Sequence, residues 1–461
     1  MIELLHLLFG GIIKWRVLSI LIFNKVENVI AIIDIGKTNK KIFLFDEKLE
    51  VVSVNRIQFE EIKDEDGFPC DNLEAIESWI FDEIEKIQSN DYYNLKAINF
   101  STHGASLIYL DKDGERIAPL YNYLKPLSLE NYEGFYESFG GKEEFSRNTA
   151  SPAYGMLNTG LQILKLQKEK PSTWEKVDAI LHYPQYLSYL FTKKITSDFT
   201  SVGAHTATWD FDKMSYHKWV SDYNLNLPIP KNGKDAVITT FNGQEIAVGS
   251  GLHDSSSSII PLLEKEKNKE FILLSTGTWI IAMNPFSKET LTQHQLKNNC
   301  LCFMTPEKQQ IKSSMQFLGQ IHEVYVKALS SHFKVDKKEH LKLQINTKLC
   351  KELICENSRI FLSEGIDNDF DAHPELLKYY VNYESAYYQL IFEISKKVIE
   401  GINLISDENN TINNVFISGG FNRNLIFIAF LKLLKRDINL KKSDCKNESA
   451  LGAALMMKSY L

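Results

Sequence analysis

Four short stretches of the sequence combine residue types that suit phosphate and hydroxyl chemistry. They are residues 34–39 (DIGKTN), 251–258 (GLHDSSSS), 275–279 (STGTW) and 418–420 (SGG). In the second stretch, Asp254 follows a glycine-bounded turn, where a carboxylate can accept a proton from a substrate hydroxyl. An Asp before a run of serines is more often a helix N-cap, so this stretch alone leaves both interpretations open. The other three stretches favour the catalytic one.

A predicted β-hairpin positions the first stretch. Residues 29–33 are an apolar strand and residues 40–46 a returning strand, with a glycine turn between them. Asp34 closes the first strand beside that turn. The backbone amides at the hairpin tip belong to Gly36, Lys37, Thr38 and Asn39. The turn is not a Walker A loop, because Ala31 stands where that motif needs its first glycine.

The second half of the chain repeats this pattern. Residues 271–274 and 279–283 are predicted strands around the turn that contains Gly277 and Thr278. The echo of the opening hairpin suggests two similarly built lobes, each offering backbone donors to a phosphate chain. Residues 414–418 are a predicted strand that delivers a glycine pair, Gly419 and Gly420, to a helix starting near Asn424. In such an arrangement the backbone can lie flat against a nucleotide.

Further elements complete the predicted core. Apolar residues at helical spacing predict an amphipathic helix over residues 73–88, and residues 384–405 are a second predicted helix. Residues 96–100 are a strand that runs into Thr102 and His103. A histidine at the end of a strand can bond a sugar hydroxyl in a cleft, although a lone histidine is more often structural.

Composition excludes several classes of protein. The 461 residues carry a net charge of −7, so no basic field for nucleic acid is evident. The six cysteines form no CxxC pair, which is typical of reduced thiols in a cytoplasmic protein. Lys14 and Arg16 split the apolar N-terminal residues, so no membrane span is predicted, and an interfacial amphipathic helix is the alternative.

The chain is long enough for two domains. A polar, proline-containing segment over residues 225–243 is the predicted crossover between them. The predicted division is therefore an extension over residues 1–26, an N-terminal lobe over 27–243 and a C-terminal lobe over 244–461. Whether the protein forms a homodimer is left open.

Taken in order, these stretches resemble the motifs of the FGGY carbohydrate kinases, members of the actin and hexokinase-like superfold. The matching segments are DIGKTNKK, GLHDSSSS, STGTW, SGGFNRN and ESALGAA. The resemblance implies an α/β fold of two ribonuclease H-like lobes with a cleft between them. It also implies phosphorylation of a small sugar with ATP and Mg²⁺.

Roles for individual residues follow from this resemblance. Asp254 is the expected general base, Asp34 the expected Mg²⁺ residue, and the sugar is expected to meet Thr102, His103 and His253. The nucleotide is expected to meet Gly36, Lys37, Thr38, Asn39, Gly277, Thr278, Gly419, Gly420 and Asn424.

The substrate is less sharply indicated. His253 before Asp254, and Trp279 at the end of the STGTW stretch, resemble the residues at these positions in rhamnulokinases and fuculokinases. This resemblance implies L-rhamnulose or L-fuculose as the substrate. Two departures weaken that expectation. Lys37 replaces a threonine of the family, and residues 122–125 (NYLK) lack the substrate-binding Asp that many relatives carry. Xylulose, another ketose or a polyol is the alternative substrate.

Two alternatives outside the kinases remain. One is an actin-like ATPase without a small-molecule acceptor, and the other is a sugar-binding regulator with a decayed active site. The presence of both Asp34 and Asp254, the carboxylates that phosphoryl transfer most needs, favours the kinase.

Overall fold

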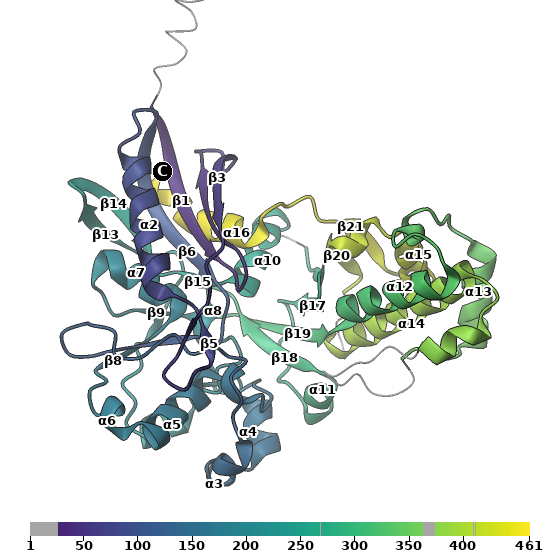
Figure 1. Cartoon of the computed structure of the whole chain (residues 1–461), viewed down its shortest axis with the longest axis horizontal. Helices are drawn as coiled ribbons and strands as arrows, with labels where there is room; N and C mark the ends of the chain where they lie inside the picture. The colour runs from purple at the N-terminus through teal and green to yellow at the C-terminus, as the bar shows by residue number, and fades with distance from the viewer. Residues whose placement is uncertain (1–25, 268, 363–373, 409, 411) are drawn as a thin grey trace, which may run out of the picture.

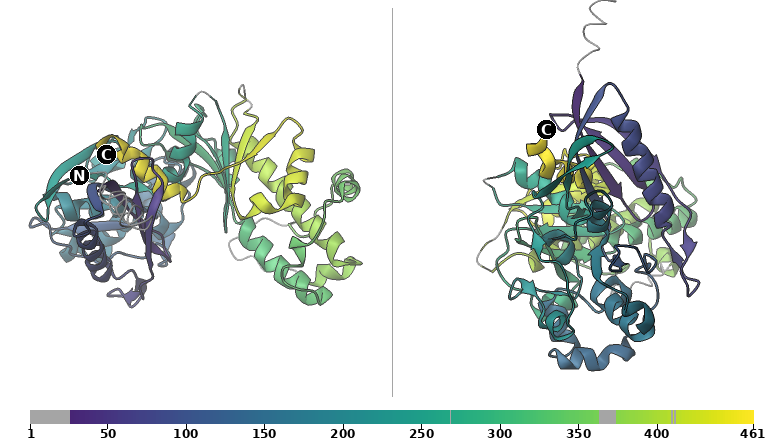
Figure 2. Two further views of the ribbon diagram at one scale, coloured as in Figure 1. Left: turned by 90° about the horizontal axis from the view of Figure 1, so that it is seen from above. Right: turned by 90° about the vertical axis from the view of Figure 1, so that its left-hand side faces the viewer.

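The computed structural model describes residues 26–267, 269–362, 374–408, 410 and 412–461. These residues form two lobes, each built around one large β-sheet (Figure 1). The first sheet has the strand order β13-β14-β6-β1-β2-β3, with β15 pairing with β6, and the second has the order β18-β19-β17-β16-β20-β21. Seen from above, the lobes lie side by side, and the C-terminal helix returns to the first lobe (Figure 2).

The first sheet is organised around two parallel strands, β1 (Glu27–Ile35) and β6 (Tyr93–Thr102). Both are apolar and buried, as expected for strands covered on both faces. The sheet is completed by β2 (Lys40–Phe45), β3 (Val51–Ile57), β13 (Ala236–Phe241), β14 (Gln244–Gly249) and β15 (Leu252–His253). Because β1, β6 and β15 run parallel, their carboxyl ends meet at one edge.

Helices cover both faces of this sheet. On one face, α2 (Leu73–Gln88) and α7 (Tyr183–Thr192) pack on the odd-numbered residues of β1. On the other face, α16 (Glu448–Met457) packs on the even-numbered residues of β1, together with Ile260 of α10 (Asp254–Lys265). Alternation of side chains along a strand explains this division.

The second sheet is also packed on both faces. Its strands are β16 (Ile272–Thr276), β17 (Ile280–Asn284), β18 (Cys300–Met304), β19 (Gln310–Gln316), β20 (Asn414–Gly419) and β21 (Asn439–Lys442). One face carries α12 (Leu318–Phe333), α13 (Thr347–Glu356), α14 (Tyr383–Leu404) and α15 (Leu425–Leu434). The other face packs on Ile259 and Leu262 of α10. Helix α10, which begins at Asp254, is therefore buried between the two sheets.

Smaller elements extend the first lobe around a separate apolar cluster. They are β7 (Leu107–Leu110), α3 (Glu133–Ser138), α4 (Lys142–Asn148), α5 (Thr159–Glu169), α6 (Pro171–Trp174), β8 (Ala179–His182) and α9 (Lys218–Asp222). Helix α8 (Phe199–Val202) instead packs on the apolar cluster of the second sheet. Short two-residue strands are β4 (Ile62–Lys63), β5 (Pro69–Cys70), β9 (Ser197–Asp198), β10 (Trp209–Asp210), β11 (Ser215–Tyr216) and β12 (Pro230–Lys231). Helix α11 (Gln293–Lys297) belongs to the second lobe.

Several sequence predictions are confirmed. The predicted helix over residues 73–88 is α2, the helix predicted over 384–405 is α14, and both predicted hairpins form, as β1–β2 and β16–β17. The predicted extension lies outside the described residues, apart from its last residue, Val26. No helix in the part of the chain that the structure describes is long and apolar enough to cross a membrane.

The division of the chain at Gly243 stays a prediction. Gly243 lies in the turn between β13 and β14, and both of these strands belong to the first sheet. The first sheet therefore continues beyond Gly243 as far as β15, and α10 begins immediately after it.

Candidate active site

Asp254 is the first residue of α10 and follows directly on β15. Pairing of His253 with Thr102 extends the sheet to residue 253, so the N-cap position falls on His253. The N-cap interpretation of Asp254 is therefore wrong. Its carboxylate accepts a hydrogen bond from the Ser255 amide at 2.6 Å, and 34% of the side chain remains exposed. The carboxylate is thus held at a helix start and is still accessible.

Asp34 lies beside Asp254, near the carboxyl end of β1. Its Oδ1 accepts a hydrogen bond from Ser449 Oγ at 3.1 Å, and Lys41 Nζ lies 3.7 Å from its Oδ2. Burial raises the pKa of Asp34 to about 6, with Lys41 lowering it and the charge of Asp254 raising it further. Burial likewise raises the pKa of Asp254. Two carboxylates that resist ionisation therefore share one site.

His253 is buried against Asp254. Its Nε2 lies 3.4 Å from Asp254 Oδ1, and its Nδ1 lies 3.4 Å from Ser256 Oγ. Burial, with help from His103, lowers the pKa of His253 to about 3, so the ring is neutral at physiological pH. The ring also packs against Phe303 of β18, with 5.4 Å between ring centres. His253 is thus placed to orient the Asp254 carboxylate.

Thr102 and His103 lie at the same edge of the first sheet as Asp254. The Thr102 hydroxyl is buried and donates to the His103 carbonyl at 2.9 Å. His103 Nδ1 lies 3.0 Å from the Gly104 carbonyl, and its Nε2 lies 3.7 Å from Asp71 Oδ2. Nδ1 of His103 is therefore engaged by the protein, whereas Nε2 is buried without a hydrogen-bond partner among the described residues, so the predicted sugar contact of His103 stays a prediction.

Asp71 is a charged residue of this site that sequence reasoning missed. It is buried between Lys40 Nζ at 3.1 Å, Lys37 Nζ at 3.8 Å and His103. Burial alone would raise its pKa, but the nearby His103 ring and the charges of Lys40 and Lys37 together lower the pKa to about 2. Asp71 precedes the N-cap of α2, so nothing in the local sequence separates it from an ordinary capping residue.

In the first predicted phosphate turn, protein groups engage both the Gly36 amide and the Lys37 cation. Gly36 N donates to the Asn39 carbonyl at 3.0 Å, which closes the turn, and Thr38 is exposed. The Lys37 ammonium bonds Glu61 at 2.7 Å, and the Asn39 side chain accepts a hydrogen bond from Gln58 at 3.0 Å. Lys37 is therefore left with its backbone groups to offer a phosphate, whereas Asn39 also keeps the N–H groups of its side-chain amide.

The second predicted phosphate turn, residues 275–279, is hydrogen-bonded to the segment that contains Gly419 and Gly420. Thr276 Oγ1 donates to the Ser418 carbonyl and accepts from the Phe421 amide at 3.1 Å. A side chain on Gly419 would lie 2.0 Å from the Thr276 carbonyl, and its φ of +82° also favours glycine. Gly277 and Thr278 are exposed at the tip of this turn. The structure thus brings Gly277, Thr278, Gly419 and Gly420 together.

Asn424 has a structural role. Its Oδ1 caps α15 by accepting from Phe427 N at 3.1 Å, and its Nδ2 donates to Tyr387 Oη at 2.8 Å. Tyr387 Oη also lies 3.1 Å from His322 Nε2, and the His322 ring packs on Phe421 at 4.8 Å between centres. The Asn424 amide is therefore engaged by protein groups, and the aromatic rings form a wall behind the glycine pair.

The described residues contain no group of three or more His, Cys, Asp or Glu side chains that could hold a metal ion. Mg²⁺ at nucleotide sites keeps most of its water and needs only one or two carboxylates besides the phosphates. Asp34 fits this requirement, because a carboxylate whose ionisation is opposed by burial and by a like charge is stabilised by a cation.

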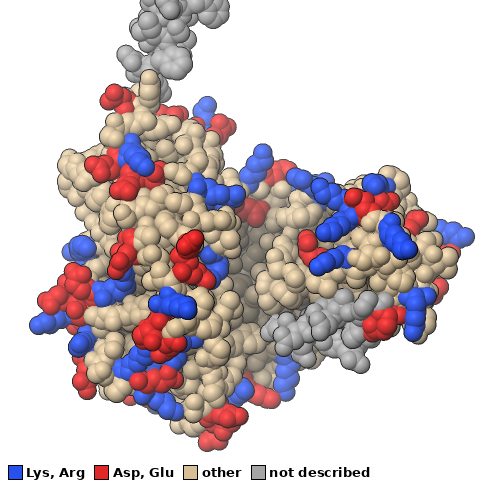
Figure 3. All heavy atoms as spheres, viewed as in Figure 1, with Lys and Arg blue, Asp and Glu red and all other residues tan. Residues whose placement is uncertain are grey.

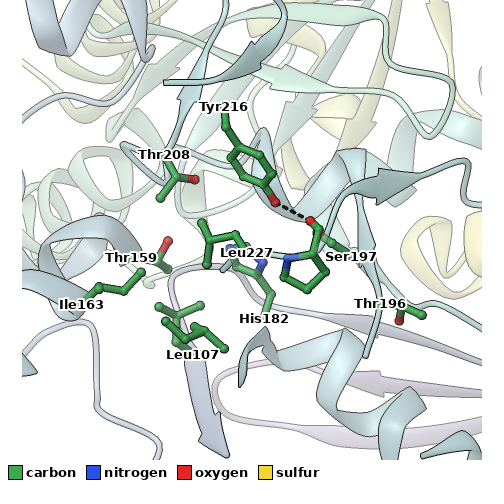
Figure 4. A pocket seen from close by; sticks show the side chains of 11 residues that line it. Leu107, Thr159, Ile163, His182, Thr196, Ser197, Thr208, Tyr216 and Leu227 are labelled. Carbon is green, nitrogen blue, oxygen red and sulfur yellow. Dashed lines mark hydrogen bonds between the residues drawn. The ribbon is translucent and has the colours of Figure 1, made fainter. Parts of the chain in front are cut away.

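The face between the lobes is hollowed, and acidic and basic side chains are mixed on it (Figure 3). A separate enclosed cavity of about 10 Å³ lies within the first lobe, lined by His182, Thr159, Thr208 and Leu227 (Figure 4). Tyr216 at its wall donates to the Pro228 carbonyl at 2.7 Å. A cavity of this size holds about one water molecule, so it is not a sugar site.

Solved structures of several carbohydrate and glycerol kinases share this fold. A carbohydrate kinase from Novosphingobium aromaticivorans superposes with a TM-score of 0.79 at 18% identity, covering 95% of this chain and 92% of that chain. A ligand-bound xylulose kinase from Lactobacillus acidophilus gives 0.71 at 13% identity, covering 94% and 89%. Plasmodium falciparum glycerol kinase with ADP gives 0.69 at 16%, covering 93% and 89%. The predicted actin and hexokinase-like α/β fold is confirmed.

Residues 29–227 match the N-terminal domain of the FGGY family of carbohydrate kinases. The predicted resemblance to this family is confirmed for this part of the chain. The rhamnulokinase of Oceanobacillus iheyensis is 24% identical over 264 residues, 54% of this chain and 54% of that protein. That of Mannheimia succiniciproducens is 23% identical over 265 residues, 54% and 52%. The chain spans about half the length of these curated relatives.

Proposed function

We propose that this protein transfers the γ-phosphoryl group of ATP to a hydroxyl of a small sugar. The observation that carries the proposal is the position of Asp254, whose accessible carboxylate begins a helix buried between two sheets and lies beside Asp34. A carboxyl whose pKa is raised toward neutrality is a stronger base than an ordinary aspartate. It therefore suits removal of a proton from an attacking hydroxyl.

The proposed chemistry is mostly positioning, because phosphoryl transfer passes through a loose transition state. Asp254 accepts the proton of the attacking hydroxyl, and His253 holds the Asp254 carboxylate in place. Asp34 holds hydrated Mg²⁺, which neutralises charge on the phosphates. The exposed Thr38 and Thr278 at the tips of the two turns offer backbone amides to the phosphate oxygens.

The proposed acceptor is a ketose such as L-rhamnulose or L-fuculose. The curated relatives named rhamnulokinase support this choice, as does the His253–Asp254 pair at the start of α10. The departures at Lys37 and at residues 122–125 keep xylulose, another ketose or a polyol as the alternative. The six free cysteines suit an enzyme of the reducing cytoplasm, where ATP is supplied.

A coupled assay of ADP release tests the proposal. Ketoses, polyols and sugar acids are each supplied with ATP and Mg²⁺, and the phosphorylated product is identified by mass spectrometry. We expect ADP release to depend on a ketose and to match the amount of sugar phosphate formed. ADP release that is independent of every acceptor would instead favour an actin-like ATPase. Sugar binding without turnover would favour a regulator.

A further inference from the structure

A buried loop of the first lobe opens to solvent at one residue beside Asp254. Every residue from 200 to 211 is buried except His205, which is partly exposed. His205 also has a φ of +43°, in the left-handed region that non-glycine residues rarely adopt, and Ala207 has a φ of +61°. Strained backbone of this kind persists only where the surroundings impose it, and it is concentrated at ligand sites.

Hydrogen bonds hold this loop on several sides. The His205 carbonyl accepts from Asn158 Nδ2 at 2.9 Å, and the Thr206 carbonyl accepts from the Gly160 amide at 2.7 Å. The Ala207 carbonyl accepts from Trp219 Nε1 at 2.6 Å. These partners fix the backbone at residues 205–207. The direction of the His205 side chain is therefore set by the fold.

The His205 ring lies against the catalytic residues. Its centre is 6.4 Å from that of His253 in an edge-on arrangement and 6.2 Å from that of Phe303, which reaches across from β18. The rings of His205 and His253 both pack against Phe303, and His253 Nε2 lies 3.4 Å from Asp254 Oδ1. His205 thus flanks the proposed acceptor site on the side of His253 and Phe303.

The two ring nitrogens of His205 have different surroundings. Nδ1 lies 3.3 Å from the Leu157 carbonyl, whereas Nε2 has no hydrogen bond to any described residue. Burial, aided by His253, lowers the pKa of His205 to about 4, so the ring is neutral. In a neutral ring the hydrogen must sit on Nδ1 to satisfy the Leu157 carbonyl, which leaves a lone pair on Nε2.

We propose that His205 is a substrate-binding residue whose Nε2 accepts a hydrogen bond from a hydroxyl of the acceptor sugar. The inference rests on the proposed function, since the hydroxyl belongs to that sugar. It adds a second histidine contact to the one predicted for His103, whose Nε2 also has no hydrogen-bond partner among the described residues. A sugar lacking a hydroxyl at this position binds more weakly.

Substitution of His205 by Asn tests the proposal. Asn tolerates the left-handed conformation, and its amide can replace Nδ1 toward the Leu157 carbonyl, but it has no atom at the position of Nε2. We expect the KM for the acceptor to rise about five- to tenfold, the scale of one neutral hydrogen bond. The KM for ATP and kcat stay within about twofold, as expected when uniform binding is removed. His332→Asn, at an exposed histidine of α12, is the matched control.

Two further measurements keep the proposal falsifiable. In the wild-type protein without ATP, addition of the acceptor should move the ¹⁵N resonance of His205 Nε2 upfield, and this experiment needs no change to the loop. The proposal would be overturned by a folded His205→Asn variant whose KM for the acceptor is unchanged. It would also be overturned if the Nε2 resonance does not move when the sugar is added. Neither result would contradict the proposed kinase activity. If the wild-type protein phosphorylates no acceptor, the proposed function fails first, and the assignment of His205 fails with it.

Discussion

Ser449 donates a hydrogen bond to Asp34 at 3.1 Å, although the two residues are 415 positions apart. Ser449 lies in the first turn of α16, and the same turn supplies the carbonyl that accepts from Ser257 Oγ of α10 at 2.7 Å. The C-terminal helix therefore holds the helix that begins with Asp254 and, at the same time, the carboxylate proposed to hold Mg²⁺. Both carboxylates of the site are positioned by one element from the far end of the chain.

Replacement of Asp254 by Asn should remove the base while keeping the shape of the site. We expect kcat to fall by roughly 10²- to 10⁴-fold, the usual contribution of a general base. Sugar affinity measured by calorimetry should change by less than about threefold, because the hydrogen bond from the Ser255 amide can be kept. A variant with wild-type kcat on the true substrate would show that another group takes the proton.

Replacement of Asp34 by Asn should stabilise the Mg²⁺-free protein at alkaline pH. The pKa of Asp34 is raised from 3.8 to about 6, so its contribution to stability is fully present below about pH 4 and is lost as the pH rises through 6. The amide that replaces this carboxyl in the variant does not ionise, so the variant keeps this contribution to stability at every pH. We expect the free energy of unfolding in urea to be about 1–3 kcal/mol higher for the variant at pH 8, and the difference to close near pH 4.

Magnesium supplies the control for this experiment. Saturating Mg²⁺ with ADP should raise the stability of the wild-type protein more than that of Asp34→Asn, because only the wild type offers a carboxylate to the ion. Asp113→Asn, at an exposed turn, should behave as wild type at every pH. Equal stabilisation of Asp34→Asn and wild type by Mg²⁺ would remove Asp34 from the metal site.

Replacement of Gly319 by Ala should damage the second phosphate turn. Gly319 lies at the start of α12, and a Cβ there would lie 1.9 Å from the Gly277 carbonyl, so the backbone of the turn must shift. We expect the KM for ATP to rise more than about tenfold, since misplacing phosphate donors is costly. Binding of the sugar in the absence of nucleotide should be retained.

Gly134→Ala is the matched control, because nothing lies within 4 Å of a Cβ at this position in α3. An ATP KM that is equally unaffected in both variants would mean that the turn does not hold the phosphates.

Replacement of Lys37 by Thr, the usual residue of the family at this position, should change little. The Lys37 ammonium bonds Glu61 at 2.7 Å and faces Asp71 at 3.8 Å, so it is already neutralised by protein carboxylates. We expect the KM for ATP to stay within about twofold and the loss of stability to be below about 1 kcal/mol, as for other partly exposed ion pairs. A tenfold rise in the KM for ATP would show that the ammonium moves to the phosphates when nucleotide binds.

Much of the site could be predicted because its parts are local. An apolar strand followed by a glycine turn specifies a hairpin whose tip presents backbone amides, and Asp34, Gly36 and Gly277 all follow this rule. The helical spacing of residues 73–88 defined α2 for the same reason. Signals of this kind are written within a few residues of the group that they position.

The tertiary structure decided how the charges are shared. Lys37 pairs with Glu61, and Asp71 pairs with Lys40. The N-cap position falls on His253, and not on Asp254, because β15 pairs with β6. His205 became a candidate only when its loop was folded beside His253. The sequence by itself determined which chemical groups stand at the ends of strands. Packing between distant segments determined which of those groups remain free to meet a ligand, because the partner that occupies a charge or a lone pair comes from another part of the chain.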